Sequence, residues 1–386
     1  MRVDRGIFYL TVSLITISIV FVYSLSIYKT VHLENVSEFH FFIRQFVAGI
    51  IGITLMWYIS TLDPDRYFIP LGASLFVVFL ILMSAMQFFP SEYVKAVNGA
   101  KRWITTPIGL SLAPVEFFKI GFAFFLAWSF SRKLDLKKIS FEQEVKRLLP
   151  YLGLFLVIVY LVAIMQNDFG QVFLMGLVLL MMGLLAGISS RTFLTFSLLG
   201  VMAGSYYVLH DETRTHRIME WLHTFQSLFF QILPESWHDK IALQSAKTQV
   251  ASSYDAIIHG GLWGTGIGNG VIKLGFLPEI HTDFILSGIA EEIGLFGVIA
   301  VIGIYFVLIY KIFKISNRLT NKVYSNFAFG VALFISLAFF INSFGITGVI
   351  PIKGIAVPFL SYGGSSMIAN CIAIGMVLMI SKRAKF

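Results

Sequence analysis

The run FILSGIAEEIGLFGVIAVIGIYFVLIY, residues 284 to 310, decides the fold of this chain. A transmembrane helix needs about 20 mostly apolar residues, and this run exceeds that length with only two charged side chains, Glu291 and Glu292. Further runs of the same character occur at residues 7–28, 39–60, 67–89, 112–131, 148–165, 170–188, 191–209, 325–346 and 355–381. The sequence therefore predicts an all-α, polytopic integral membrane protein with ten transmembrane helices, forming a single domain over residues 1–386.

The composition excludes a soluble protein. Apolar residues make up 57% of the chain and charged residues 13%, whereas soluble domains carry roughly 45–50% and 25%. The net charge of +8 is explained by Lys and Arg in cytoplasmic loops, so we predict no nucleic-acid partner. The only cysteine, Cys371, excludes an intrachain disulfide. The N-terminal segment Met1–Arg5 lacks a small-residue cleavage site and predicts an uncleaved first span.

The distribution of basic residues predicts the orientation. Lys and Arg gather in the Arg132–Arg147 loop, in the 311–322 loop and in the 382–385 tail. In a ten-span protein all three lie on the side of the N-terminus, and the positive-inside rule makes that side the cytoplasm. Both termini are therefore predicted to be cytoplasmic. The segments at about 90–110 and 210–283 become extracytoplasmic loops, and loops as long as the second, between helices 7 and 8, are usually functional or disordered.

Two motifs in the second outer loop suggest chemistry. The series GGLWGTGIGNG, residues 260–270, begins like a nucleotide-binding loop, but it lacks the preceding strand and the following Lys-Ser/Thr that such a loop needs. Tight turns and close packing explain its glycines better. The segment LPEIHTDF, residues 277–284, places Glu279, His281 and Asp283 near the outer interface. Partial desolvation would make Asp283 a good proton acceptor. It could also be the N-cap of the eighth span, and the two roles are compatible.

Charged side chains inside the spans are functional candidates, because burying them in a membrane is costly. Glu291 and Glu292 are two of these, with a basic residue of another span, such as Arg44, as the structural alternative. Glu116 and Lys119 are spaced i,i+3 and can form an ion pair. Alternatively, Lys119 faces a cavity and meets an anionic headgroup.

Two further segments stand out. Lys101, Arg102 and Trp103 lie in the first outer loop, where a basic pair beside Trp is commonly an interfacial anchor. The tenth span opens with Pro358 and Gly363-Gly364, which would break or kink a membrane helix.

Four ordered motifs resemble those of the SEDS family (shape, elongation, division and sporulation) across nearly the whole chain. They are GAKRWI at 99–104, LPEIHTDF at 277–284, EEIG at 291–294 and PFLSYGGSS at 358–366. Lys353-Gly354 ahead of Val357-Pro-Phe is similar to the division-type rather than the elongation-type members. The chain departs from the family at Ala113-Pro-Val-Glu116, where Gln-Pro-Ser-Glu is usual, at Gln166-Asn-Asp168, where Gln-Pro-Asp is usual, and at Ser111, where a basic residue is frequent.

The resemblance implies a peptidoglycan glycosyltransferase that polymerises lipid II at the outer face of the bacterial cytoplasmic membrane, for septal synthesis in cell division. It implies a class B penicillin-binding protein and other divisome membrane proteins as partners, with lipid II and undecaprenyl-pyrophosphate-linked glycan as ligands. Asp283 would be the catalytic carboxylate. The residues expected to bind substrate are Lys101, Arg102, Trp103, Glu116, Lys119, Glu279, His281, Thr282, Ser365 and Ser366. We expect no protein-ligated metal, and whether a divalent cation (Mg or Mn) assists the pyrophosphate is open.

Three other functions compete. An elongation-type polymerase would share the four ordered motifs, and only Lys353-Gly354 ahead of Val357-Pro-Phe favours the division type. A lipid II flippase would also use intramembrane charges and broken helices, but it needs polar residues through the whole membrane depth, whereas the candidates here cluster toward the outer face. A scaffold that only recruits a synthase would leave the buried acids without a purpose.

Overall fold

The computed structural model describes residues 3–33, 36–94, 100–105, 111–133, 140–210, 215, 218, 221, 249–351 and 354–385. Gly99 and Lys353, which carry part of the family motifs, lie outside the described residues, as do 134–139 of the Arg132–Arg147 loop and most of 211–248.

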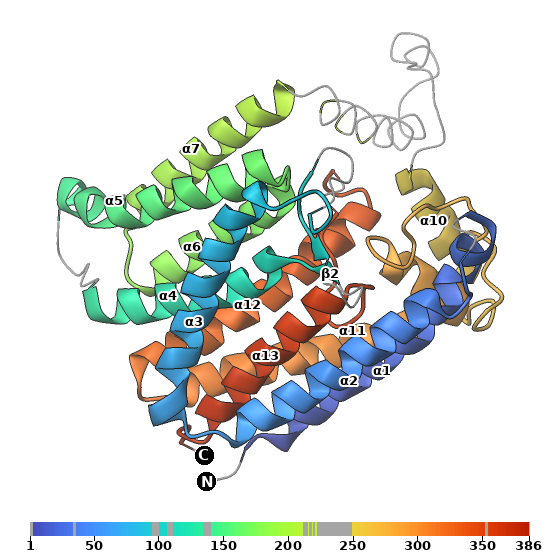
Figure 1. Ribbon diagram of the computed structural model, residues 1–386, viewed down its shortest axis with the longest axis horizontal. Coiled ribbons are helices and arrows are strands. Elements are labelled where there is room, and N and C mark those ends of the chain that lie inside the picture. The colour runs from blue at the N-terminus through green and yellow to red at the C-terminus, as the bar shows by residue number, and fades with distance from the viewer. Residues whose placement is uncertain are drawn as a thin grey trace.

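The described chain is almost entirely helical (Figure 1). Its α-helices are α1 (Arg5–Tyr28), α2 (His40–Thr61), α3 (Pro64–Ala85), α4 (Pro114–Lys133), α5 (Phe141–Ile158), α6 (Phe169–Leu185), α7 (Ser190–Leu209), α10 (Gln249–Gly260), α11 (Ile285–Arg318), α12 (Lys322–Ile346) and α13 (Gly364–Ser381). Shorter π- and 3-10 segments are η1 (Lys29–Leu33), η2 (Met86–Phe88) and η3 (Val159–Met165). A small antiparallel pair joins β1 (Ile104–Thr105) to β2 (Ser111–Leu112) before α4.

The prediction of an all-α, polytopic membrane protein is confirmed. Within the described residues, eight helices are long and apolar enough to cross a membrane. Helix α6 is shorter, at 17 residues, and α4 carries Glu116 and Lys119 within its first two turns. A helix does occupy each of the ten predicted spans, but the count of ten crossings stays a prediction.

The start of the tenth span was predicted wrongly. It was expected at residue 355, and the helix begins only at Gly364. Pro358 has no N–H to donate to a helix, and Phe359 takes a φ of 64°, which helical backbone does not allow. Residues 354–363 therefore run as an irregular segment, whose carbonyl groups are satisfied by other elements: Ser18 donates to Leu360, and Tyr305 donates to Pro358.

The core includes α1–α4 and α11–α13, with close packing of α2 on α13, α3 on α4, and α11 on both α1 and α12, and buried residues of α5 and α6 join it. Helix α7 lies at the edge of the bundle beside α5 (Figure 1). Large apolar side chains remain exposed there, including Leu156 on α5 and Met202 on α7, each 67% exposed. In a membrane protein such a surface faces lipid rather than water.

The two termini meet at one end of the bundle, next to the α2–α3 and α11–α12 connections (Figure 1). Lys311 lies 3.3 Å from Asp4, and Arg383 pairs with Asp65. Leu319 forms a backbone bridge with Ala384. This places the predicted cytoplasmic 311–322 loop and tail on the same end as the N-terminus, as the charge pattern requires.

Candidate functional site

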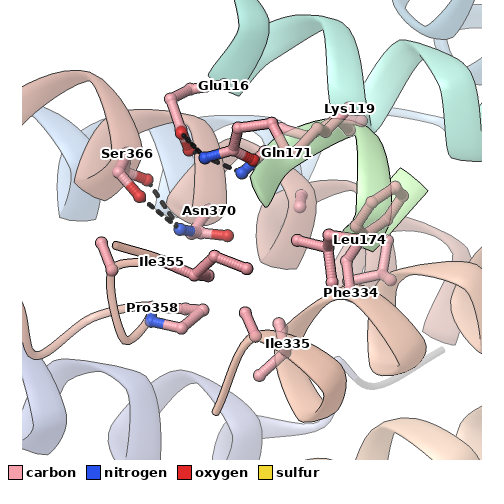
Figure 2. Close-up of a pocket in the computed structure, with 15 residues that line it drawn as sticks. Glu116, Lys119, Gln171, Leu174, Phe334, Ile335, Ile355, Pro358, Ser366 and Asn370 are labelled. Atoms are coloured by element: carbon pink, nitrogen blue, oxygen red, sulfur yellow. Dashed lines mark hydrogen bonds and ion pairs between the residues drawn. The ribbon is translucent and has the colours of Figure 1, made fainter. Parts of the chain in front are cut away.

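A pocket lies among α4, α6, α12, α13 and the irregular segment before α13. Figure 2 shows polar side chains on one side of it and apolar ones on the other. The polar residues that line it are Glu116, Lys119, Gln171, Ser366 and Asn370. Apolar lining comes from residues such as Leu174, Phe334 and Ile335. A polar wall facing an apolar wall suits an amphiphilic ligand.

Glu116 is the centre of the polar wall. One carboxylate oxygen forms a 2.9 Å salt bridge with Lys119, and the other accepts a 3.1 Å hydrogen bond from Gln171 of α6 (Figure 2). The i,i+3 ion pair predicted for Glu116 and Lys119 is therefore confirmed. Lys119 also lines the pocket, so the two interpretations of this lysine are compatible.

The two serines expected to bind substrate have different surroundings. Ser366 lines the pocket, and Asn370 donates to its carbonyl and hydroxyl oxygens at 2.8 and 3.2 Å. Ser365 accepts from the Ala113 amide and donates to the Ser111 carbonyl, both at 2.9 Å. Ser365 therefore joins α13 to the start of α4 and is not a lining residue of this pocket.

Asp283 is not an N-cap, so that alternative is wrong. Helix α11 begins at Ile285 after Phe284, and no side chain caps it. The Asp283 carboxylate is partly buried and lies beside Gly354, where a Cβ would come within 3.2 Å of Oδ2. The side-chain amide of Asn342 donates to the carbonyls of both Asp283 and Ile355, at 2.7 and 2.9 Å. Since Ile355 lines the pocket, this contact ties the backbone of Asp283 to the pocket wall.

The other polar residues of the LPEIHTDF motif contact the protein itself. Glu279 forms a 2.6 Å salt bridge with Lys29, and Thr282 donates to the Glu279 carbonyl and carboxylate. His281 is 1% exposed, with its ring 4.7 Å from that of Phe41 and 5.7 Å from that of Tyr362. These contacts fix the turn that precedes Asp283.

Burial and charge set the ionisation of this turn, which lies outside the spanning helices. Burial, together with the nearby Lys29 ammonium, lowers the pKa of His281 to about 4. Burial by itself would raise the pKa of Glu279, but the hydrogen bond and charge of Lys29 outweigh it and lower that pKa. At neutral pH the turn therefore holds a neutral His281 beside a Glu279–Lys29 ion pair.

The basic residues of the first outer loop do not line the pocket. Arg102 donates to the carbonyls of Gln166 and Asn167 and lies 4.0 Å from the Asp168 carboxylate. Burial raises the pKa of Asp168, partly offset by the charge of Arg102. The Arg102 guanidinium lies 6.0 Å from the Trp103 ring, which is 37% exposed, and Lys101 donates to the Gln87 carbonyl. Arg102 thus holds the turn that starts α6, the helix that supplies Gln171.

Glu291 and Glu292 do not pair with Arg44 or Lys119. Glu292 binds Lys273 at 2.8 Å, and the side chains of Lys273 and Glu292 are 7% and 0% exposed. Glu291 accepts from the amides of Val271 and Ile272 at 2.7 and 3.0 Å. Both acids therefore hold the glycine-rich loop, and the packing interpretation of its glycines is confirmed by positive φ angles at Gly261, Gly264, Gly266 and Gly268.

Sequence reasoning missed the amides at this site. Gln171, Asn342 and Asn370 lie in the predicted sixth, ninth and tenth spans. A lone amide in an apolar run needs a buried partner, and that signal could have singled them out. Lys29 and Lys273 were missed because each lies far in sequence from its acidic partner.

Comparison with known proteins identifies the family. The FtsW/RodA/SpoVE family model, described as "Cell cycle protein", matches residues 5–386. A Helicobacter pylori protein named "Probable peptidoglycan glycosyltransferase FtsW" is 44% identical over the full length of both chains. A Geobacter sulfurreducens protein of the same name is 32% identical, over 100% of this chain and 96% of its own.

Solved structures share the fold. A chain from "Structural coordination of polymerization and crosslinking by a peptidoglycan synthase complex" superposes with a TM-score of 0.72 at 21% identity, covering 99% of this chain and 98% of its own. The crystal structure of the Thermus thermophilus rod shape determining protein RodA gives a TM-score of 0.66 at 21% identity, covering 100% and 99%. The chain belongs to the FtsW/RodA/SpoVE family of cell cycle proteins, the SEDS family that its motifs resemble.

Proposed function

We propose that this chain is a peptidoglycan glycosyltransferase that polymerises lipid II into β-1,4 glycan at the outer face of the cytoplasmic membrane, at the division septum. The full-length 44% identity to a protein named as an FtsW glycosyltransferase supports the activity and the division role. The observation that carries the site is the contact of Asn342 with both Asp283 and Ile355, because it ties the proposed base to a pocket with one polar and one apolar wall.

In this proposal Asp283 acts as general base. It takes the proton of the acceptor sugar 4-hydroxyl while that oxygen bonds to the anomeric carbon of the donor. The bond from this carbon to the pyrophosphate breaks in the same step, and undecaprenyl pyrophosphate leaves. Displacement from the opposite face converts the α-linked donor into a β linkage. The leaving group needs no acid, consistent with one carboxylate in the catalytic role.

The leaving pyrophosphate carries negative charge that fixed cations must stabilise. Lys119 is proposed for this role, since it lines the pocket and Glu116 holds it in place. Ser366 would bind sugar hydroxyls, and the apolar wall would accept the first units of the lipid. Lys101, Arg102, Trp103, Glu279, His281, Thr282 and Ser365 are proposed to shape the site from outside the pocket.

Metal binding by the protein is not part of the proposal. In the described part of the chain, no three His, Cys, Asp or Glu side chains gather in a way that could hold an ion.

The partner proposed is a class B penicillin-binding protein, supported by a structural neighbour from a peptidoglycan synthase complex. Polymerisation of labelled lipid II by the purified protein, with and without this partner, tests the activity. Glycan strands from the wild type and a strong loss in Lys119→Met are expected. Transfer of lipid II between leaflets without any polymer would contradict the proposal and favour a flippase.

A further inference from the structure

The glycine-rich loop fills a break in helix α11. At Gly294 the backbone of that helix has φ 68° and ψ −173°, so the helix stops and restarts. The amides of Thr265 and Gly266 donate to the carbonyls of Glu291 and Glu292, at 3.0 and 2.9 Å. In the other direction, the amides of Leu295 and Phe296 donate to the carbonyls of Gly261 and Leu262. The loop therefore supplies the hydrogen bonds that the break removes from the helix.

Glycine is required where the two backbones meet. A Cβ on Gly264 would lie 2.3 Å from the Glu292 carbonyl oxygen, and one on Gly294 would lie 2.3 Å from the Gly264 nitrogen. Both residues also have positive φ angles, which other residues rarely adopt.

A buried ion pair fixes the same loop from its other end. Lys273 contacts the Glu292 carboxylate at 2.8 Å, the Gly268 carbonyl at 2.7 Å and the Ser24 hydroxyl at 3.1 Å. Ser24, on α1, also donates to Glu292 at 2.6 Å. All three ammonium donors of Lys273 are thereby used, which is what makes a buried cation tolerable.

Asp283 lies in the middle of the segment that this ion pair closes. Lys273 precedes it by ten residues and Glu292 follows it by nine. We propose that Lys273 and Glu292 are positioning residues, whose ion pair holds the 273–292 segment so that Asp283 meets the acceptor hydroxyl. The inference rests on the proposed function for its catalytic half. The structural part of the inference, that the Lys273–Glu292 pair orders residues 277–284, does not depend on the proposed function.

The test compares Glu292→Gln and Lys273→Met with wild type, in nanodiscs, by lipid II turnover and by hydrogen–deuterium exchange. Each variant should lower kcat roughly 10- to 100-fold, the effect of a small misplacement of a reacting group, with KM little changed. Amides of residues 277–284 should exchange faster. The double variant Lys273→Met/Glu292→Met should be no slower than either single variant. Each substitution alone already removes the Lys273–Glu292 contact, so the second has nothing further to remove.

Glu144→Gln is the matched control. Glu144 is also a buried carboxylate, 2% exposed, but it accepts from Ser189 and Thr192 far from this loop. Its loss should leave exchange of residues 277–284 unchanged. Asp283→Asn separates the two halves of the inference, since it should lower turnover by roughly 10²–10⁴ without faster exchange.

If the amides of residues 277–284 exchange at the wild-type rate in both single variants, the inference is overturned, whatever the turnover of these variants. Wild-type kcat with faster exchange would overturn its catalytic half, while wild-type turnover by Asp283→Asn would overturn the proposed base instead. If a single variant does not fold, the double variant decides, because it leaves no buried unpaired charge. A double variant that also fails to fold would overturn the inference, since the pair would then hold the whole fold rather than one segment.

Discussion

The side chain of Asn342 holds the backbone of Asp283 by donating a 2.7 Å hydrogen bond to its carbonyl, and a 2.9 Å bond to the carbonyl of Ile355. One amide on α12 thereby joins the end of the long outer loop to the segment that precedes α13. The site is thus built from three parts of the chain that are distant in sequence.

Asn342→Ala should lower both stability and turnover. It leaves two carbonyls without their donor, at about 1–3 kcal/mol for each one that stays buried. A lower melting temperature in detergent and a kcat reduced about 10-fold are expected, the latter because Asp283 shifts. Ser336→Ala is the control, because Ser336 donates only within α12. Equal behaviour of the two variants would show that Asn342 has no special connection to the site.

Asp283→Asn should be folded and nearly inactive. Asparagine keeps the size of the side chain and removes its ability to accept a proton, so polymerisation should fall by roughly 10²–10⁴, the usual contribution of a general base. Expression and melting temperature should stay near those of wild type. Asp4→Asn, at the opposite end of the bundle, controls for loss of a carboxylate. An Asp283→Asn protein that polymerises lipid II at the wild-type rate would contradict the assignment of the base.

Gly294→Ala should be strongly destabilising. The new methyl group would meet the Gly264 nitrogen at 2.3 Å, and the φ of 68° would strain any residue with a side chain. Gly303→Ala, on the same helix, meets nothing within 4 Å and should be neutral or stabilising by up to about 1 kcal/mol. Thermal unfolding of the two variants side by side measures the difference, and similar melting temperatures would argue against the close packing.

Stability should fall in mild acid through His281. Its pKa is about 4 in the folded protein against 6.5 ordinarily, so the unfolded chain binds the proton more readily. The stability contributed by the neutral ring is present above about pH 6.5 and is lost progressively as the pH falls toward 4, to a total of about 3 kcal/mol. Glu279, whose pKa is lowered, weakens the fold in the same direction when it is protonated.

Melting temperatures between about pH 7.5 and 4.5 measure this effect. His281→Phe should reduce the slope of the profile, because phenylalanine keeps an aromatic ring beside Phe41 and Tyr362 and does not titrate. His210→Phe, at an exposed position, should leave the slope as in wild type. If the melting temperature of His281→Phe changes with pH as steeply as that of wild type, the acid sensitivity comes from groups other than His281.

The orientation predicts which face reacts with an impermeant thiol reagent. In a Cys371→Ala background, Trp263→Cys, at a side chain 81% exposed in the outer loop, should label in intact cells. Lys314→Cys, near the other end of α11, should label only after permeabilisation. The reverse pattern would invert the topology.

Local composition was enough to predict the helices, because length and apolar character decide what crosses a membrane. The Glu116–Lys119 ion pair could be predicted from helical spacing, because residues three apart lie on the same face of a helix. The possible cap role of Asp283 was wrong, since α11 starts one residue later than the apolar run suggests. Where the polar partners lie could not be predicted, because Lys273 reaches Glu292 only once a loop has folded against two helices, and no local pattern encodes such a contact.

The break at Gly294 has a consequence for the barrier that the bilayer forms. Unpaired backbone groups within a membrane protein attract water, and a line of water molecules conducts protons. Here the loop and the two halves of α11 satisfy one another's amides and carbonyls on both sides of the break. The chain can therefore interrupt α11 without leaving these backbone groups unpaired, so the break offers them to neither lipid nor a file of water.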